Sequence, residues 1–190
     1  NLSEADVNVP GGYATTAKAF WDFLDHNQLR ERIKLRLKEL NVDDVKQLIS
    51  VGKEIRQWIV ESPFQDRLKK SIEDAYEEMS DGDNECSIAV RSSATAEDLP
   101  GLSFAGQQET YLNVRGADEV AAAVKNCWAS LWTAQAISYR HQNGIEQDSV
   151  AMAVVVQVMV PSDVSGILFT ANPATGERNE MIVNASFGLG

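Results

Sequence analysis

Residues 86–114 constrain the fold more than any other stretch, because they contain two short runs of strand composition around a long polar segment. Residues 86–90 are mostly apolar, and residues 110–114 form the next run of that kind. Between the two runs lie Arg91, several hydroxyl side chains, a Pro-Gly pair and scattered Gly and Ala residues. The pattern predicts a strand that ends at Val90, a loop that begins at Arg91, and a second strand.

The residue types in this loop suit a polyphosphate. A guanidinium group presents a fixed set of donors to phosphate oxygens, and hydroxyl groups add neutral donors. Gly and Ala let backbone N–H groups approach an anion closely. A simpler interpretation also fits, in which Arg91 is a surface arginine that pairs with Glu97 or Asp98 and holds the loop in place. The residues alone leave both interpretations open.

Longer motifs add a resemblance that covers nearly the whole chain. The motifs are AVRSSATAEDLP and SFAGQQETYLNV in the centre, VPGGYATTAKAF near the start and SGILFTANP near the end. They resemble the nucleotide-binding domain shared by phosphoenolpyruvate synthase, pyruvate phosphate dikinase and rifamycin phosphotransferase. The first two thirds are most similar to phosphoenolpyruvate synthase, and the last third is equally similar to the rifamycin-modifying enzyme. The resemblance implies an ATP-grasp-type fold and the use of ATP with Mg²⁺.

The resemblance also implies which residues contact ATP. By its position in the AVRSS motif, Arg91 is the phosphate-binding arginine. Gly106 and Thr110 are loop contacts of the FAGQ and ET motifs, and Gln157 is a base or ribose contact. From the residues alone, Gln157 could instead bond neighbouring backbone, because an unpaired amide on an apolar strand costs about 1–3 kcal/mol. Four secondary candidates either touch ATP or stiffen the loop: Ser92, Ser93, Thr95 and Gln107.

No catalytic residue and no metal ligand is assigned to this chain. The family's phosphorylated histidine lies in a separate swivelling domain, within a small-residue motif that surrounds neither His26 nor His141. Both histidines are expected at the surface, near helix ends. Glu97 and Asp98 are interpreted as exposed acids, because the resemblance places the metal-binding acids in a later lobe. A Gly-Gly-Lys loop whose lysine contacts ATP phosphates in the family is absent and is expected upstream.

Helical periodicity dominates the first 80 residues, and strand patterns dominate the rest. We expect an α+β fold, the first lobe of an ATP-grasp-type nucleotide-binding domain that is truncated at both ends. Its helical part, residues 1–80, would pack on a mostly antiparallel mixed sheet with one long helix, residues 86–190. Residues 151–160 should be a strand buried on both faces. The expected helices begin near Thr15 or Thr16, at Leu29, at Asp43 or Asp44, at Pro63 and at Ala117. Val45 is among the buried candidates of the third helix, and the last is a long helix that reaches Gln142. Further strands are expected over residues 165–171 and 180–184.

The net charge limits the classes of molecule expected as partners, and the cysteines indicate the redox compartment. The formal net charge of −11 at pH 7 disfavours nucleic acid and anionic lipid as partners, and no apolar run approaches the length of a membrane span. Cys86 and Cys127 are expected to be free thiols in a reducing cytoplasm, because one falls in a predicted strand and the other in a predicted helix.

The chain is therefore interpreted as the ATP-binding fragment of a phosphotransferase similar to a pyruvate, water dikinase. The resemblance implies that the parent enzyme phosphorylates its own histidine and then pyruvate, giving phosphoenolpyruvate, AMP and phosphate. Its partners would be ATP, the swivelling phosphohistidine domain and the pyruvate-binding domain, and the fragment alone should be inactive. Two alternatives remain: a rifamycin-type small-molecule dikinase, and a non-catalytic acidic interaction module that kept the fold.

Overall fold

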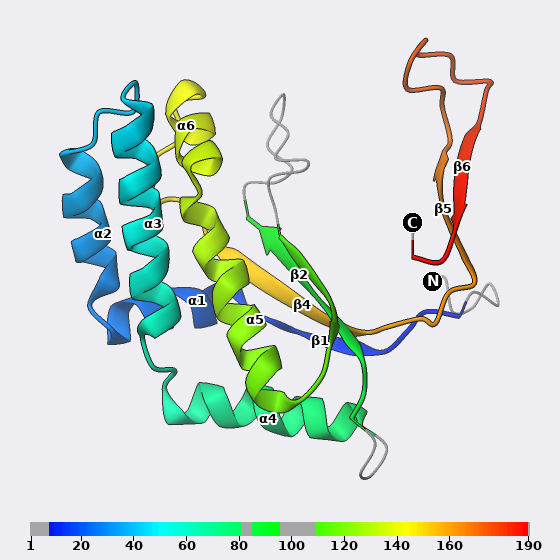
Figure 1. The fold of residues 1–190 in the computed structure, drawn as a ribbon, viewed down its shortest axis with the longest axis horizontal. Helices are drawn as coiled ribbons and strands as arrows, with labels where there is room; N and C mark the ends of the chain where they lie inside the picture. The colour runs from blue at the N-terminus through cyan, green and yellow to red at the C-terminus, as the bar shows by residue number, and fades with distance from the viewer. Residues whose placement is uncertain (1–7, 81–84, 96–108, 190) are drawn as a thin grey trace. The chain divides into compact units, whose positions relative to one another are not determined.

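The structure is a computed structural model that describes residues 8–80, 85–95 and 109–189 (Figure 1). The chain divides into two compact units, Asn1–Met159 and Val160–Gly190. Four residues named above, Glu97, Asp98, Gly106 and Gln107, lie outside the described residues, so the expectations for them stay predictions.

The first helices begin at the capping residues that the sequence suggests. Thr16 accepts a hydrogen bond from the Ala19 N–H, and Asp44 accepts from the N–H groups of Lys46 and Gln47. These side chains satisfy N–H groups that have no partner inside the helix. The elements are β1 (Gly12–Thr15), α1 (Ala17–His26), α2 (Leu29–Lys38), α3 (Val45–Glu61) and α4 (Asp66–Met79).

Two details of this helical part differ from expectation. The fourth helix, α4, begins at Asp66 and not at Pro63. Phe64, which precedes the helix, packs instead against Phe23, with ring centroids 5.5 Å apart. Val45 is 64% exposed, since it occupies the first position of α3, whereas Leu48 one turn later is buried. No helix among the described residues combines the length and apolarity needed to cross a bilayer.

The rest of the first unit supplies three strands and two further helices. The long helix expected over residues 117–142 is wrong, because extended backbone at Thr133 interrupts it. Thr133 also caps the second segment by accepting a hydrogen bond from the Ala136 N–H at 3.1 Å. The elements are β2 (Ile88–Ala94), β3 (Thr110–Val114), α5 (Ala117–Ala129), the short 3-10 helix η2 (Ser130–Trp132), α6 (Ala134–Gln142) and β4 (Met152–Val158).

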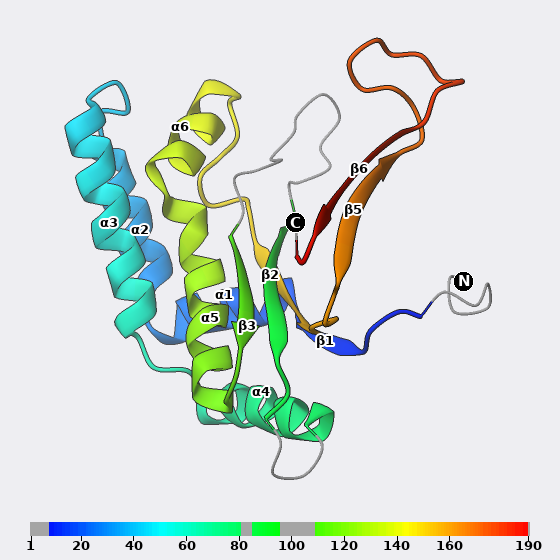
Figure 2. The same cartoon turned by 45° about the vertical axis from the view of Figure 1, so that its right-hand side comes forward.

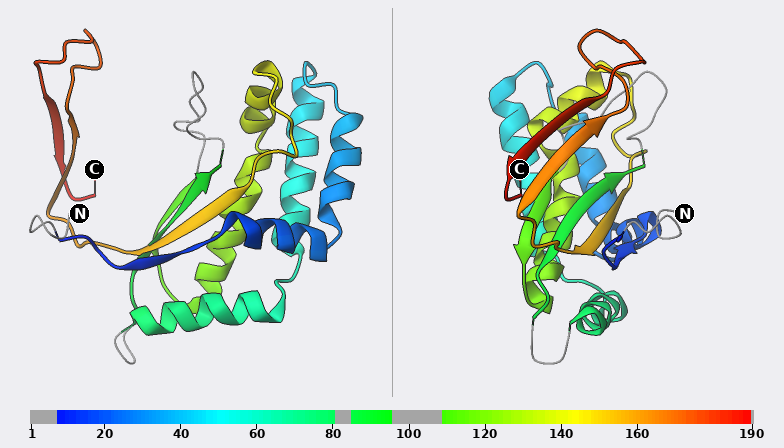
Figure 3. Two further views of the ribbon diagram at one scale, coloured as in Figure 1. Left: turned by 180° about the vertical axis from the view of Figure 1, so that it is seen from behind. Right: turned by 90° about the vertical axis from the view of Figure 1, so that its right-hand side faces the viewer.

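The four strands form one sheet in the order β1-β4-β2-β3, and every neighbouring pair is antiparallel. The helices contact the sheet from one side: α5 packs on β2, β3 and β4, and α1 packs on β4 (Figures 2 and 3). An α+β chain with an antiparallel sheet is thus confirmed. Side chains on the covered face are fully buried or nearly so: Ile88, Val90, Met152, Val154 and Val156.

The second face of this sheet, which we call the open face, is not covered by any helix among the described residues of the first unit. Side chains alternate between the two faces along a strand, so Ala153, Val155 and Gln157 of β4 lie on the open face. All three are only partly buried. The expectation that residues 151–160 are buried on both faces is therefore wrong: helices cover one face only.

Aromatic side chains form the centre of the core between the helices. Trp128 packs against Phe20 and Phe23, with ring centroids 5.9 and 5.0 Å apart, and Trp132 stacks on Phe20 at 6.0 Å. Both tryptophans are buried, as their helical spacing indicates. Trp58 is only partly buried, beneath the guanidinium group of Arg32, which lies 3.7 Å from the ring centroid.

The second unit is a β-hairpin. Its strands are β5 (Val164–Phe169) and β6 (Ile182–Phe187), which pair in antiparallel register from Val164↔Phe187 to Phe169↔Ile182. The strand expected over residues 180–184 is therefore shifted and continues to Phe187.

Candidate functional site

The pairing of β2 places Arg91 at the centre of the open face. Arg91 is opposite Val155 on β4 and opposite Thr110 on β3. On β1, Ala14 is opposite the same Val155. Directly opposed residues of antiparallel strands project their side chains to the same face. One row therefore crosses all four strands on the open face: Ala14, Val155, Arg91 and Thr110.

Arg91 lies inside strand β2, which corrects the expectation that it begins a loop. Hydrogen bonding to β3 on one side and β4 on the other holds the backbone extended through Ala94, whatever the local strand preference of the Arg-Ser-Ser run. The Arg91 side chain is exposed, and no carboxylate among residues 8–80, 85–95 and 109–189 lies within ion-pair distance of it. Its position in the strand directs the side chain away from the helix-covered core.

Gln157 lies two residues along β4 from Val155 and so on the same face. It is opposite Ala89 on β2 and Gly12 on β1. Its Nε2 donates a hydrogen bond to the Pro10 carbonyl oxygen at 3.4 Å, which is long and leaves the amide oxygen available. The backbone contact that we considered for this amide is thus present, and the side chain still borders the open face.

A shallow hollow of about 350 Å³ lies beside this amide, between β1 and β4. Its floor is formed by small and apolar side chains, among them Ala14 and Val155. Gly12 is needed here because an added Cβ would clash with the carbonyl oxygen of Val156. Gly12, Ala14 and Val155 were not predicted as site residues from the sequence. The two-residue period of a strand nevertheless implies that Ala153, Val155 and Gln157 share one face.

The secondary candidates within the described residues, Ser92, Ser93 and Thr95, do not all lie on the open face. Ser93 is opposite Ala153 and lies on the open face with Arg91. Ser92 projects to the other face, and its hydroxyl donates to the Glu109 carbonyl oxygen at 3.1 Å. The Thr95 hydroxyl accepts from the Ala151 N–H at 3.1 Å and ties the end of β2 to the residue before β4. Through these contacts Ser92 and Thr95 hydrogen-bond to backbone groups of the segments beside β2.

Neither histidine lies on the open face. His26 ends α1 and His141 is near the end of α6, and both are exposed, as expected. No group of three or more His, Cys, Asp or Glu residues that could hold a metal ion occurs in the described part of the chain.

Both cysteines are free thiols, which confirms that they are not bonded to each other. Cys127 is fully buried in α5, and this burial raises the pKa of its thiol to about 12. The thiol is therefore neutral near pH 7 and is not a nucleophile.

Comparison with known proteins identifies the family. The whole chain, residues 1–190, matches the family model described as "Pyruvate phosphate dikinase, AMP/ATP-binding domain". Phosphoenolpyruvate synthase of Neisseria meningitidis serogroup B is 51% identical over 193 residues, which cover 100% of this chain and 24% of the relative. The enzyme of the same name from Escherichia coli is 48% identical, with the same coverage, and that from Aquifex aeolicus is 48% identical over 100% of this chain and 23% of the relative.

The chain spans about a quarter of the length of these relatives. The match nevertheless extends over every element described above, including the four strands that form the open face. This chain is about 50% identical to phosphoenolpyruvate synthases, and it belongs to the family of pyruvate phosphate dikinase AMP/ATP-binding domains.

Proposed function

We propose that the open face is part of the ATP site of a longer dikinase that makes phosphoenolpyruvate from pyruvate. The observation that carries this proposal is that Arg91, Thr110 and Gln157, which lie far apart in the sequence, share one face of adjacent strands. On this face, which no helix of the described first unit covers, the guanidinium and hydroxyl groups are donors suited to phosphate oxygens. The amide is a donor suited to a nucleoside.

The direction of the row suggests how the nucleotide lies. Neighbouring strands are about 4.8 Å apart, so the row from Thr110 to Ala14 crosses about 14 Å. We place the phosphates over Arg91 and Thr110 and the nucleoside over the hollow, next to Gln157. The row contains no carboxylate, so the net charge of −11 does not prevent phosphates from binding there.

The remaining ligands belong to the same proposal. Gly106 is assigned to the site from its motif, as a backbone contact. Mg²⁺ usually binds through one or two carboxylates together with the substrate phosphates. As the family resemblance implies, we assign the ligands of Mg²⁺ to other parts of the parent protein.

The chain would bind ATP while other domains perform the transfer. In this scheme a histidine in a swivelling domain takes the β- and γ-phosphoryl groups of ATP together, which releases AMP. Water then removes the outer phosphate, and the phosphoryl group that remains on the histidine passes to pyruvate to give phosphoenolpyruvate. The names of the relatives favour pyruvate over rifamycin as the acceptor. The shared placement of Arg91, Thr110 and Gln157 argues against a non-catalytic interaction module. We also assign the parent enzyme to the cytoplasm, on the basis of the two free thiols.

Substitution of Arg91 in the full-length protein tests the proposal. Arg91→Ala is expected to weaken ATP binding by about 1.5–3 kcal/mol, the range for hydrogen bonds to charged groups, or about ten- to 150-fold. Arg91→Lys should restore only part of the affinity, because an ammonium group lacks the planar fork of donors. Titration calorimetry with a non-hydrolysable ATP analogue measures the affinity, and thermal unfolding is recorded on the same samples.

Arg67→Ala is the matched control, because Arg67 is an exposed arginine on α4, away from the sheet. It should leave the affinity unchanged. An Arg91→Ala variant with the affinity of the parent protein would contradict the proposal. If that variant also unfolded at a lower temperature, Arg91 would have the loop-holding role of the simpler interpretation.

A further inference from the structure

The β5–β6 hairpin has one face made only of apolar or small residues. The pairs Val164↔Phe187, Gly166↔Ala185 and Leu168↔Val183 project to this side, which we call the apolar hairpin face. The other side is mixed, because it carries Ser165, Asn184 and Ser186 together with the apolar Ile167, Phe169 and Ile182. Only the apolar hairpin face lacks polar side chains.

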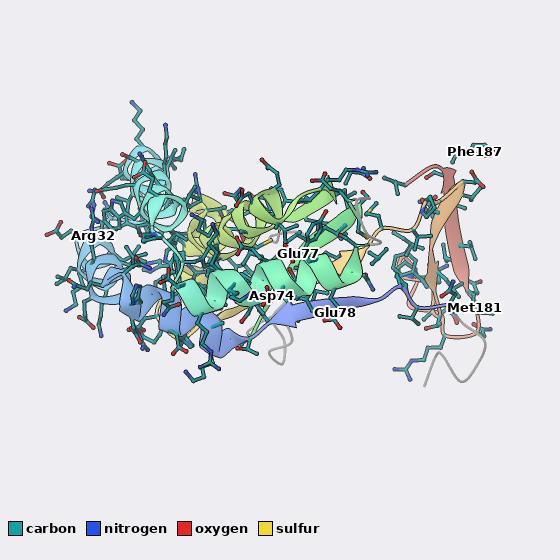
Figure 4. All side chains as sticks on the ribbon, turned by 90° about the horizontal axis from the view of Figure 1, so that it is seen from below. Arg32, Asp74, Glu77, Glu78, Met181 and Phe187 are labelled. Atoms are coloured by element: carbon teal, nitrogen blue, oxygen red, sulfur yellow. The ribbon has the colours of Figure 1, made fainter. Side chains whose placement is uncertain are left out.

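The apolar hairpin face is exposed to a degree that is unusual for such side chains. The exposed fractions are 92% for Phe187, 69% for Val183, 58% for Leu168 and 57% for Val164. Figure 4 shows Phe187 and Met181 at opposite ends of β6. A two-stranded hairpin is at best marginally stable in water, and it needs a further layer on its apolar side. This face is thus one side of a contact.

We propose that the apolar hairpin face packs against a segment of the parent polypeptide that lies outside these 190 residues. The known relatives supply such a segment, because this chain covers only 23–24% of their length. The proposal shares with the proposed function the premise of a longer parent protein, but it does not depend on ATP binding.

The size of the face argues against a second copy of the chain as the partner. Burying a Val, Leu or Phe side chain removes about 60–120 Å² of apolar accessible surface from water, so the four large side chains of this face supply at most about 500 Å². A stable protein–protein interface buries about 800 Å² of accessible surface on each partner. A face of this size is too small to hold a dimer together, but it is suited to form one wall of a larger core.

The first experiment maps the contact by photo-cross-linking in the full-length protein. Phe187 is replaced by p-benzoyl-phenylalanine, which preserves an aromatic ring at the most exposed position of the face. After irradiation, mass spectrometry of the digest should find position 187 joined to a peptide from outside residues 1–190. The same group at position 186, on the opposite side of the strand, should not label that peptide.

Three results would overturn the proposal. Cross-links only to residues 8–159 would show that the first unit covers the face. Cross-links between differently isotope-labelled copies would identify a dimer contact. Attachment to solvent or to no peptide would show that the face stays exposed. None of these results changes the ATP affinity measured for the Arg91 variants, so the two proposals fail independently.

A second measurement guards against distortion by the bulky probe. Val183→Lys and Asn184→Lys introduce the same side chain at adjacent positions on opposite sides of β6. In the full-length protein, Val183→Lys is expected to accelerate hydrogen exchange across residues 182–187 at least tenfold, because it places a charge in an apolar contact. Asn184→Lys should change exchange much less. Equal effects of the two substitutions would contradict an apolar contact on the Val183 side.

Discussion

Two adjacent valines on β4 provide a direct test of the one-sided sheet. Val154 lies on the covered face with no exposed surface, and its N–H donates to the Thr15 hydroxyl at 3.1 Å. Val155 lies on the open face and is only partly buried. The change Val→Ala removes the same two methyl groups at either position, so any difference in outcome reflects the surroundings of the side chain.

The structure sets the expected size of the two effects. At Val154 the change costs about 0.8 kcal/mol for each of the two buried methyl groups, and the cavity left behind adds to this, for a total of about 1.6–3 kcal/mol. At Val155 the cost should be below about 1 kcal/mol, because water already reaches the side chain. Val155→Ala should instead affect ATP affinity, since it lowers the floor of the hollow beside Gln157.

Native-state hydrogen exchange of β4 in the full-length protein measures this difference. A loss of about 1.6–3 kcal/mol corresponds to exchange that is about 15- to 150-fold faster in Val154→Ala. Local exchange is the better readout, because thermal unfolding of a protein with several domains does not follow one transition. Equal acceleration in both variants would refute the assignment of an open face, and with it the argument that Arg91 faces a ligand.

Two further predictions concern the site wall and the buried thiol. Gly12→Ala should separate β1 from β4 and weaken nucleotide binding, because the added Cβ clashes with the Val156 carbonyl oxygen. The control is Gly11→Ala, where an added Cβ meets nothing within 4 Å. Calorimetry measures the nucleotide affinity of both variants. Iodoacetamide at pH 8 should modify Cys86 well before Cys127 in the native protein, because burial of Cys127 raises its pKa to about 12; peptide mass spectrometry follows both sites, and equal rates would contradict the buried position.

Local signals in the sequence were sufficient for the starts of α1 and α3, but not for the start of α4 or for the break at Thr133 between η2 and α6. Thr16 and Asp44 mark helix starts by their own chemistry, and Phe20, Phe23 and Leu24 show the buried stripe of α1 by spacing alone. The AVRSS and ET motifs likewise identified Arg91 and Thr110 as candidates, and the family assignment followed from the chain as a whole. Caps, helical spacing and motifs depend only on residues close together in the chain, so they can be identified from the sequence alone.

The arrangement of the site depends on contacts between distant segments. Alternation on β4 separates Val154 from Val155, but only the packing of α1 and α5 decides which of the two is covered. Arg91 belongs to a strand because β3 and β4 hydrogen-bond to it from both sides, and no local preference of an Arg-Ser-Ser run indicates this. The register across three strand pairs then places Arg91, Thr110 and Gln157 on one face. Strand pairing joins residues far apart in sequence, so only the tertiary structure could show that these three side chains lie on the same face of the sheet.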